Sequence, residues 1–274
     1  MPDQSGLTKN LSSLQLRVLS ASVLAPVAVA AVFLGGLYFT LFLSLAGMIM
    51  CFEWCRASFA NNKANYCVLI AVWLLVALYL NYEGQILSAF LSLFICMVCV
   101  FILTLFKGEE SEWKGACVAP VYIGVPILCL LNLRNSQPDG LALTALLFFV
   151  VWATDTGAYF SGKLIGGAKI AVSISPNKTW AGLIGGMISA AIVAVITTVT
   201  MMSLDHAVWQ IAMTGALFAV MSQVGDFAES AWKRYFDIKD ASEIIPGHGG
   251  VLDRLDGVLF VAPVLYLIVI VVGI

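Results

Sequence analysis

Residues 86–106 read ILSAFLSLFICMVCVFILTLF and contain no charged side chain. A helix of about 20 such residues crosses the roughly 30 Å of hydrocarbon in a bilayer. Similar stretches recur along the 274-residue chain, which is 61% hydrophobic and 11% charged and has a mean hydropathy of +0.97. Because a soluble domain carries about 25% charged residues, the chain is predicted to be an all-α polytopic membrane protein whose partner is the lipid bilayer.

The apolar stretches divide into nine predicted transmembrane helices. They lie at about 18–34, 37–55, 66–80, 86–106, 116–133, 141–162, 180–202, 207–230 and 257–273. The runs are continuous, whereas the strands of a membrane β-barrel alternate between apolar and polar residues. We expect residues 1–135 to form an N-terminal group of about five spans. Residues 136–274 are then expected to form a C-terminal group that carries the functional site.

The basic residues segregate to one side of this arrangement. The N-terminus and every second connection after it hold Lys9, Arg17, Arg56, Lys63, Lys107, Lys114, Lys163, Lys169, Lys178, Lys233, Arg234, Lys239 and Arg254. The other side holds Arg134 alone. Since loops rich in Lys and Arg stay in the cytoplasm, we expect a cytoplasmic N-terminus and a C-terminus outside. The net charge of −2 gives no basic surface for nucleic acid.

A polar stripe follows the end of the eighth span. Ser222, Asp226, Glu229 and Lys233 are spaced at i, i+4, i+7 and i+11, so they share one face of a helix. Ionisable groups at membrane depth usually face a cavity or a partner. An internal pair between Glu229 and Lys233 is the simpler interpretation, and it explains Glu229 better than Asp226.

The segment after this stripe holds the highest density of charge in the chain. It contains Lys233, Arg234, Lys239, Asp240, Glu243, His248, Asp253, Arg254 and Asp256. Its centre includes Gly249 and Gly250, and such glycines permit backbone amides to approach a ligand. Carboxylates that hold Mg²⁺ and cations that neutralise phosphate oxygens are what phosphoryl or nucleotidyl transfer requires. A solvated charged loop is the alternative interpretation.

Two further sites come from the connection before the seventh span and from the sixth span. Ser175 followed by Pro176 is typical of a helix start, where free amides together with Lys178 would bind an anion such as phosphate. Lys178 could instead only anchor the span at the interface. Asp155 lies within the sixth span. It is therefore either a residue of the site or a partner in a hydrogen bond between two helices.

Residues 230–256 read SAWKRYFDIKDASEIIPGHGGVLDRLD, which resembles the signature of the phosphatidate cytidylyltransferases, also called CDP-diacylglycerol synthases. The segments DTGAY (155–159), SPNKTW (175–180) and GDFAES (225–230) are similar to that family as well. This resemblance covers the second half of the chain, and the first half is similar in hydrophobic character only. Trp232 replaces an aliphatic residue or Phe, and Ala181 stands where the family often has Glu.

The resemblance implies a reaction, a cofactor and an assembly. CTP and phosphatidate would give CDP-diacylglycerol and pyrophosphate, with Mg²⁺ bound either alone or together with a second cation. The family also implies a homodimer in the cell inner (cytoplasmic) membrane. Because CTP arrives from the cytosol while the acyl chains stay in the bilayer, we expect the active site to face the cytoplasm.

The expected roles of individual residues follow from the same resemblance and from their chemistry. Asp226 and Asp253 are expected to bind the metal, and Asp256 to assist directly or indirectly. Phosphate-binding roles fall to Lys233, Arg234, Lys239, Arg254, Ser175 and Lys178. His248 is expected to bind a phosphate or shape the glycine turn. The remaining substrate-binding candidates are Thr179, Asp155, Glu229, Asp240, Gly249 and Gly250.

Three other functions compete with this one. Residues 253–257 imitate the opening of the CDP-alcohol phosphotransferase motif, but no acidic residue follows Asp256. A polyprenol-type CTP kinase is the closer alternative. A transporter could also bury Asp155 and Asp226, although it would need polar residues along a path to the other side.

Overall fold

The computed structural model describes residues 13–59, 63–106, 113–202 and 207–272. Within these ranges, nine helical segments are long and apolar enough to cross a membrane, which confirms the predicted fold class and number of spans. Eight are single helices: α1 (Ser13–Leu34), α2 (Gly36–Ser58), α3 (Lys63–Tyr82), α4 (Ile86–Phe106), α7 (Gly140–Leu164), α8 (Trp180–Met201), α9 (Val208–Tyr235) and α10 (Leu252–Val272). The remaining span joins α5 (Trp113–Ala119), the π-helical turn η2 (Pro120–Gly124) and α6 (Val125–Asn135).

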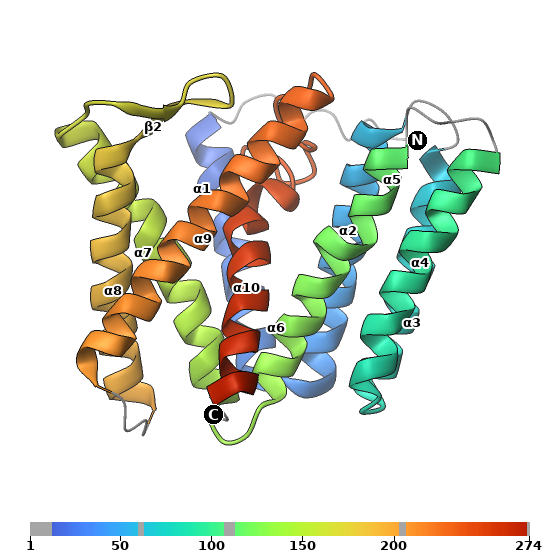
Figure 1. Cartoon of the computed structure of the whole chain (residues 1–274), viewed down its shortest axis with the longest axis horizontal. Coiled ribbons are helices and arrows are strands. Elements are labelled where there is room, and N and C mark those ends of the chain that lie inside the picture. The colour runs from blue at the N-terminus through green and yellow to red at the C-terminus, as the bar shows by residue number, and fades with distance from the viewer. Residues whose placement is uncertain (1–12, 60–62, 107–112, 203–206, 273–274) are drawn as a thin grey trace.

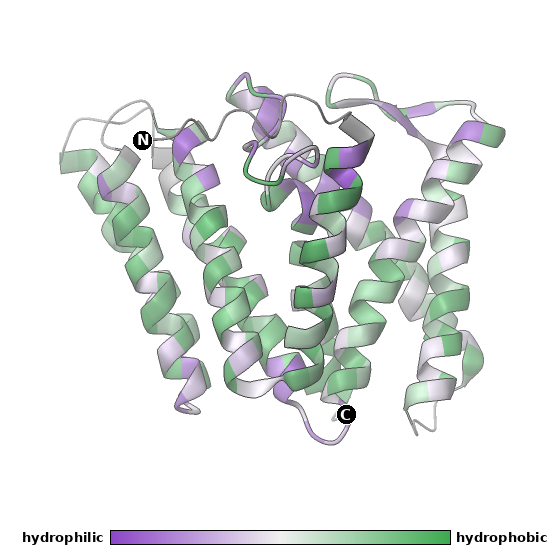
Figure 2. Cartoon of the chain, turned by 180° about the vertical axis from the view of Figure 1, so that it is seen from behind, coloured by the Kyte–Doolittle hydropathy of each residue, from purple (hydrophilic) through white to green (hydrophobic). Residues whose placement is uncertain are grey.

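The helices run side by side, and the polar connections gather at one end of the bundle (Figures 1 and 2). α7, α8 and α9 lie on one side, α2 to α5 on the other, and α6 and α10 between them (Figure 1). The start of α1 and the start of α10 lie at the polar end, and α10 finishes at the opposite end. Thus the connections predicted to hold most of the basic residues share one end, although Lys9 and Lys107 lie outside the described residues.

The connection between α7 and α8 folds as a β-hairpin, contrary to the sequence-based expectation. β1 (Lys169–Ala171) pairs antiparallel with β2 (Ser175–Thr179). The predicted helix start at Ser175 is therefore wrong, because pairing of Ala171 with Ser175 extends the backbone there. The true N-cap is Thr179, whose hydroxyl accepts a hydrogen bond of 3.0 Å from the Gly182 amide.

α10 begins five residues earlier than predicted, at Leu252 instead of residue 257. The apolar pattern starts only after Asp256, whereas the helix starts with the polar turn before it. Asp253 and Asp256 therefore lie in the first turns of a membrane-spanning helix. This placement holds both carboxylates on a rigid element.

Small residues bring α7 and α8 into close contact. A side chain at Gly186 would reach within 3.1 Å of the Thr154 carbonyl oxygen, and one at Gly182 would reach within 3.0 Å of the Ala158 carbonyl oxygen. Gly182 and Gly186, four residues apart on α8, are therefore packing positions of this helix pair. Such contacts drive helix association where water contributes no hydrophobic force.

Arg134, the exception to the charge bias, has a structural role at the end opposite the hairpin. Its Nε donates to the Val32 carbonyl at 2.6 Å, and its Nη2 donates to the Phe33 carbonyl at 3.0 Å. The last carbonyls of a helix lack partners within that helix. Arg134 therefore caps the end of α1.

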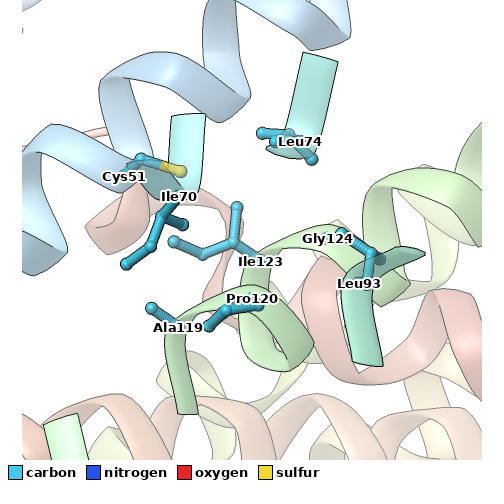
Figure 3. A pocket seen from close by; sticks show the side chains of 8 residues that line it. All are labelled: Cys51, Ile70, Leu74, Leu93, Ala119, Pro120, Ile123 and Gly124. Atoms are coloured by element: carbon cyan, nitrogen blue, oxygen red, sulfur yellow. The ribbon is translucent and has the colours of Figure 1, made fainter. Parts of the chain in front are cut away.

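The π-helical turn packs against the first half of the chain. Pro120 has no amide to donate, and such positions favour a locally widened helix. Apolar side chains from α2, α3 and α4 close around it and leave no room for a water molecule (Figure 3). The third residue of the turn, Tyr122, packs instead against Trp54 and Phe260, with ring centres 5.0 and 6.0 Å away.

A larger cavity of about 380 Å³ lies between α7, α8, α9 and α10. Its lining includes Leu143, Met202, Gln210 and Val272, which lie at the helix ends away from the hairpin. The cavity is therefore distant from the charged residues that follow.

Candidate active site at the polar end of the bundle

Three carboxylates from three helices surround one lysine. Asp155 of α7, Asp226 of α9 and Asp256 of α10 lie within electrostatic range of one another and of Lys178 from β2. The close approach of α9 and α10 requires Gly225, since a side chain there would lie 2.4 Å from the Asp256 carbonyl oxygen. The helices thus concentrate negative charge around a single ammonium group.

Lys178 makes an ion pair with Asp226 and lies over an aromatic ring. Its Nζ contacts Asp226 Oδ2 and is 4.6 Å from the centre of the Phe227 ring. Among the described residues, this ammonium group has no hydrogen bond beyond the ion pair. An ammonium carries three donors, so two remain to bind an anionic ligand.

Lys233 lies between two other carboxylates. Its Nζ is 2.7 Å from Glu229 Oε2 and 2.9 Å from Asp253 Oδ1. The side chains of Glu229 and Asp253 are only 3% and 6% exposed. The simpler interpretation of Glu229 as an internal partner of Lys233 is therefore confirmed, with Asp253 as a second partner.

Asp253 also organises the loop that precedes α10. Its Oδ2 accepts hydrogen bonds from the amides of Gly250 at 2.7 Å and Ala241 at 3.1 Å. Gly249 has a φ of 82°, and its α-carbon approaches Asp253 Oδ2 so closely that a side chain would reach 2.9 Å. The glycines therefore permit the loop to wrap around this carboxylate.

Helix α1 supports the tip of the same loop. Ser20 Oγ lies 2.8 Å from His248 Nδ1, and Arg17 Nε donates to the Gly247 carbonyl at 2.9 Å. Arg254 Nε donates to the His248 carbonyl at 2.9 Å. His248 is thus held in the turn from both sides, as expected of a residue that shapes it.

Five predicted site residues lie apart from these contacts. Arg234, Lys239 and Asp240 are exposed and form no ion pair within the described residues. Ser175 lies at the start of β2, away from the helix N-terminus assigned to it. Thr179 is buried and serves as the cap of α8.

Two residues of the first half lie beside these groups and were not predicted from sequence. Glu53 of α2 is fully buried and bonds to the loop before α10. Tyr122 of η2 places its hydroxyl in a buried position near Asp226, Glu229 and Asp256. For Glu53 a signal was present, because a carboxylate within a predicted span is a functional candidate. For Tyr122 the sequence held none, since the π-turn that carries it is visible only in the structure.

The carboxylates near Lys178 are of the kind that could hold a magnesium ion together with phosphate oxygens. No group of three His, Cys, Asp or Glu side chains among the described residues forms a ready-made metal site. Mg²⁺ is commonly bound through one or two carboxylates, with waters and phosphates completing its shell. Asp226 and Asp256, on adjacent helices, provide such a pair.

Comparison with known proteins agrees with this chemistry. Residues 15–272 match the model of the "Cytidylyltransferase family". The chain is 37% identical over 259 residues to the phosphatidate cytidylyltransferase of Brucella suis biovar 1 (strain 1330), covering 94% of this chain and 93% of the relative. It is 34% identical over 257 residues to that of Bacillus subtilis (strain 168), covering 91% and 95%. The likeness thus extends through the first half of the chain, further than the motifs indicated.

Proposed function

Since the chain belongs to the cytidylyltransferase family, we propose that the carboxylates around Lys178 form its site for making CDP-diacylglycerol from CTP and phosphatidate. The chain acts as a phosphatidate cytidylyltransferase, a nucleotidyltransferase of phospholipid synthesis. One observation supports the location: Asp226 pairs with Lys178 beside Asp256, at the polar end of the bundle. That arrangement places carboxylates that could bind a metal ion next to an ammonium group that could bind phosphate.

The reaction joins two anions and expels a third. An oxygen of the phosphatidate phosphate forms a bond to the α-phosphorus of CTP, and the bond from that phosphorus to the bridging oxygen of the β-phosphate breaks. Pyrophosphate leaves with the bonding electron pair. The attacking oxygen is already ionised, so the site needs no strong general base. Its main tasks are positioning and charge neutralisation.

Magnesium, when bound, would neutralise phosphate oxygens and help the pyrophosphate leave. We propose that Asp226 and Asp256 hold it. Asp253 remains a predicted ligand, but its Oδ2 already accepts two amide hydrogen bonds and its Oδ1 pairs with Lys233. Asp253 would therefore have to share an oxygen with these donors. A second cation remains a prediction of the resemblance.

The cations have different roles in this proposal. Lys178, with two donors left, binds a phosphate of CTP or of the lipid. Arg254 is exposed next to the same site and provides a second positive group. Lys233 is already bound to Glu229 and Asp253, so it keeps those carboxylates in place. Arg234 and Lys239 remain candidates to attract CTP from solution, with Asp240 beside them.

The orientation and assembly are also proposals. The chain is a multi-pass membrane protein of the bacterial inner membrane, as its bacterial relatives indicate. The charge bias supports a site that faces the cytoplasm. A membrane-impermeant maleimide tests this: Lys169→Cys should react in inverted vesicles, and Asp139→Cys in right-side-out vesicles. The family resemblance favours a homodimer, which cross-linking in native membranes would test.

The product of labelled CTP distinguishes this function from a lipid kinase. Membranes with the chain should transfer label from the α-phosphate of CTP into lipid and release the γ-label as pyrophosphate. Transfer of the γ-label into lipid would overturn the proposal in favour of a kinase.

Neutral variants test the location of the site. Asp226→Asn and Asp256→Asn should each lower CTP-dependent CDP-diacylglycerol formation by about 100-fold at saturating Mg²⁺. Asp139→Asn, at the opposite end of the bundle, is the control and should leave the rate unchanged. Near-normal turnover in either test variant would remove that residue from the proposed metal pair.

A further inference from the structure

Glu53 is a completely buried carboxylate within the first half of the chain. Among the described residues it forms no ion pair. Burying a carboxylate is costly unless hydrogen bonds or a countercharge replace the lost water. The hydrogen-bond donors around Glu53 therefore explain how its carboxylate can be buried there.

All of the donors belong to the segment that leads into α10. Glu53 Oε1 accepts hydrogen bonds from Ser242 Oγ at 2.5 Å and from the Val251 amide at 2.9 Å. Its Oε2 accepts the Leu252 amide at 2.9 Å. The side chain thus connects α2 to a segment about 190 residues further along the chain.

Glu53 supplies a cap that the local sequence lacks. The first amides of a helix have no partner within it and are usually capped by a Ser, Thr, Asp or Asn side chain. Gly250 and Val251 precede α10 and offer no such oxygen. The negative group from α2 takes this place, where the helix dipole also favours it.

The loop has room for Glu53 only because residue 250 is glycine. A side chain there would lie 2.6 Å from Glu53 Oε1 and 3.0 Å from the Ala241 side chain. The glycine assigned to substrate binding from sequence therefore has a second task, which is to admit the carboxylate of α2.

The neighbouring residues of α2 hold α9 in the same way. Trp54 stacks on Trp232 with ring centres 4.7 Å apart, and Trp232 Nε1 donates to Ser58 Oγ at 3.1 Å. Lys233 follows Trp232 directly, and Asp253 follows Leu252. One end of α2 therefore anchors both partners of the ion pair between Lys233 and Asp253.

We propose that Glu53 is a positioning residue for cytidylyl transfer: it holds the start of α10, and with it Asp253 and Asp256, in register with α9. Glu53 contacts neither substrate in this proposal and acts through the loop and helix that it caps. The inference rests on the proposed placement of the active site at this end of the bundle.

Glu53→Gln is the sharpest test because it keeps the shape of the side chain. In either orientation its NH₂ group faces the amide of Val251 or Leu252, so one hydrogen bond is lost. We expect kcat to fall by about 10–100-fold and KM for CTP to rise several-fold, as for a small misplacement of catalytic groups. Hydrogen–deuterium exchange of the full-length protein in detergent should increase in peptides covering residues 241–255. Exchange in α3, which packs on α2, should stay unchanged.

Two further variants keep the test decisive. Glu83→Gln, an exposed glutamate at the opposite end of the bundle, is the matched control and should behave as the unaltered protein. Ser242→Ala removes one of the three donors and should give smaller changes in kcat, in KM for CTP and in exchange at residues 241–255. This variant keeps the test possible if Glu53→Gln does not fold.

The possible outcomes separate this inference from the proposed site. Unchanged hydrogen–deuterium exchange at residues 241–255 in Glu53→Gln would overturn the positioning role. The role would also be overturned if Vmax fell only as far as the amount of folded protein fell, while KM for CTP stayed the same. If Asp226→Asn and Asp256→Asn lose activity while Glu53→Gln keeps normal kinetics, the inference alone fails. If both aspartate variants stay active, the proposed site fails first.

Discussion

Lys178 of the β-hairpin and Asp226 of α9 form an ion pair across two segments that are separated by the whole of α8. This contact brings the hairpin to the carboxylates of the helices, so the hairpin contributes a charged group as well as a connection. Its position explains why a short sheet occurs in an otherwise helical protein. The pair also provides a direct test of the substrate-binding role of Lys178.

Lys178→Met should weaken CTP binding more than it affects folding. Loss of a charge-assisted contact to phosphate should raise KM for CTP about tenfold, equivalent to ~1.4 kcal/mol. Initial rates over a range of CTP concentrations measure this. Lys163→Met is the control, because Lys163 is exposed at the end of α7; equal kinetics in both variants would contradict the role.

Gly225→Ala should separate α9 from α10. The added methyl group would lie 2.4 Å from the Asp256 carbonyl oxygen, and such overpacking costs about 1–3 kcal/mol. We expect a lower unfolding temperature and a lower kcat, because Asp226 and Asp256 move apart. Val224→Ala changes the adjacent exposed residue and should lower neither the unfolding temperature nor kcat. An unfolding temperature like that of the unaltered protein would show that the helices have room to adjust.

Lys233→Met should destabilise the protein strongly. It leaves Glu229 and Asp253 buried without their shared cation, and breaking a buried pair in this way costs about 3–5 kcal/mol. Thermal unfolding in detergent measures the loss. Arg234→Met, next in sequence but exposed, should shift the unfolding temperature little. Addition of Glu229→Gln to Lys233→Met should restore part of the stability, and strict additivity of the two changes would argue against the bridge.

Arg134→Leu should affect stability without affecting the chemistry. It removes the two hydrogen bonds that cap α1, at a cost of about 1–3 kcal/mol. The unfolding temperature should fall, while kcat per folded molecule and KM for CTP stay constant. Arg56→Leu replaces an exposed arginine at the other end as a comparison. A change in KM for CTP in Arg134→Leu would contradict a purely structural role.

The spans could be predicted from sequence because each depends on a local property. A run such as residues 86–106 has no stable place except in hydrocarbon, whatever its neighbours. The ends of the helices were harder to predict from sequence. α10 starts before its apolar run because its first turn is capped by a residue from α2, and β2 replaces a helix start because it pairs with β1.

The difference between local sequence properties and contacts between distant segments also decides which site residues could be predicted. Asp226, Asp253, Asp256 and Lys178 could be predicted as site candidates because their motifs are dense and local. The pair of Glu229 with Lys233 was among the interpretations of the sequence, because the two residues are one helical turn apart. The pairs of Lys233 with Asp253 and of Lys178 with Asp226 were not predicted, since each joins segments that are distant in the chain. Glu53 and Tyr122 were missed because each stands alone in an apolar sequence and acquires its neighbours only when distant helices meet.

The anchor between Glu53 and Leu252 joins an early part of the chain to a late one. Synthesis proceeds from the N-terminus, so α2 enters the membrane long before the donors of its carboxylate, 198 and 199 residues away, exist. A nascent chain that stops before α10 exposes an unsatisfied carboxylate among its helices. Insertion of the final span completes the cap of α10 and gives the Glu53 carboxylate its hydrogen-bond donors.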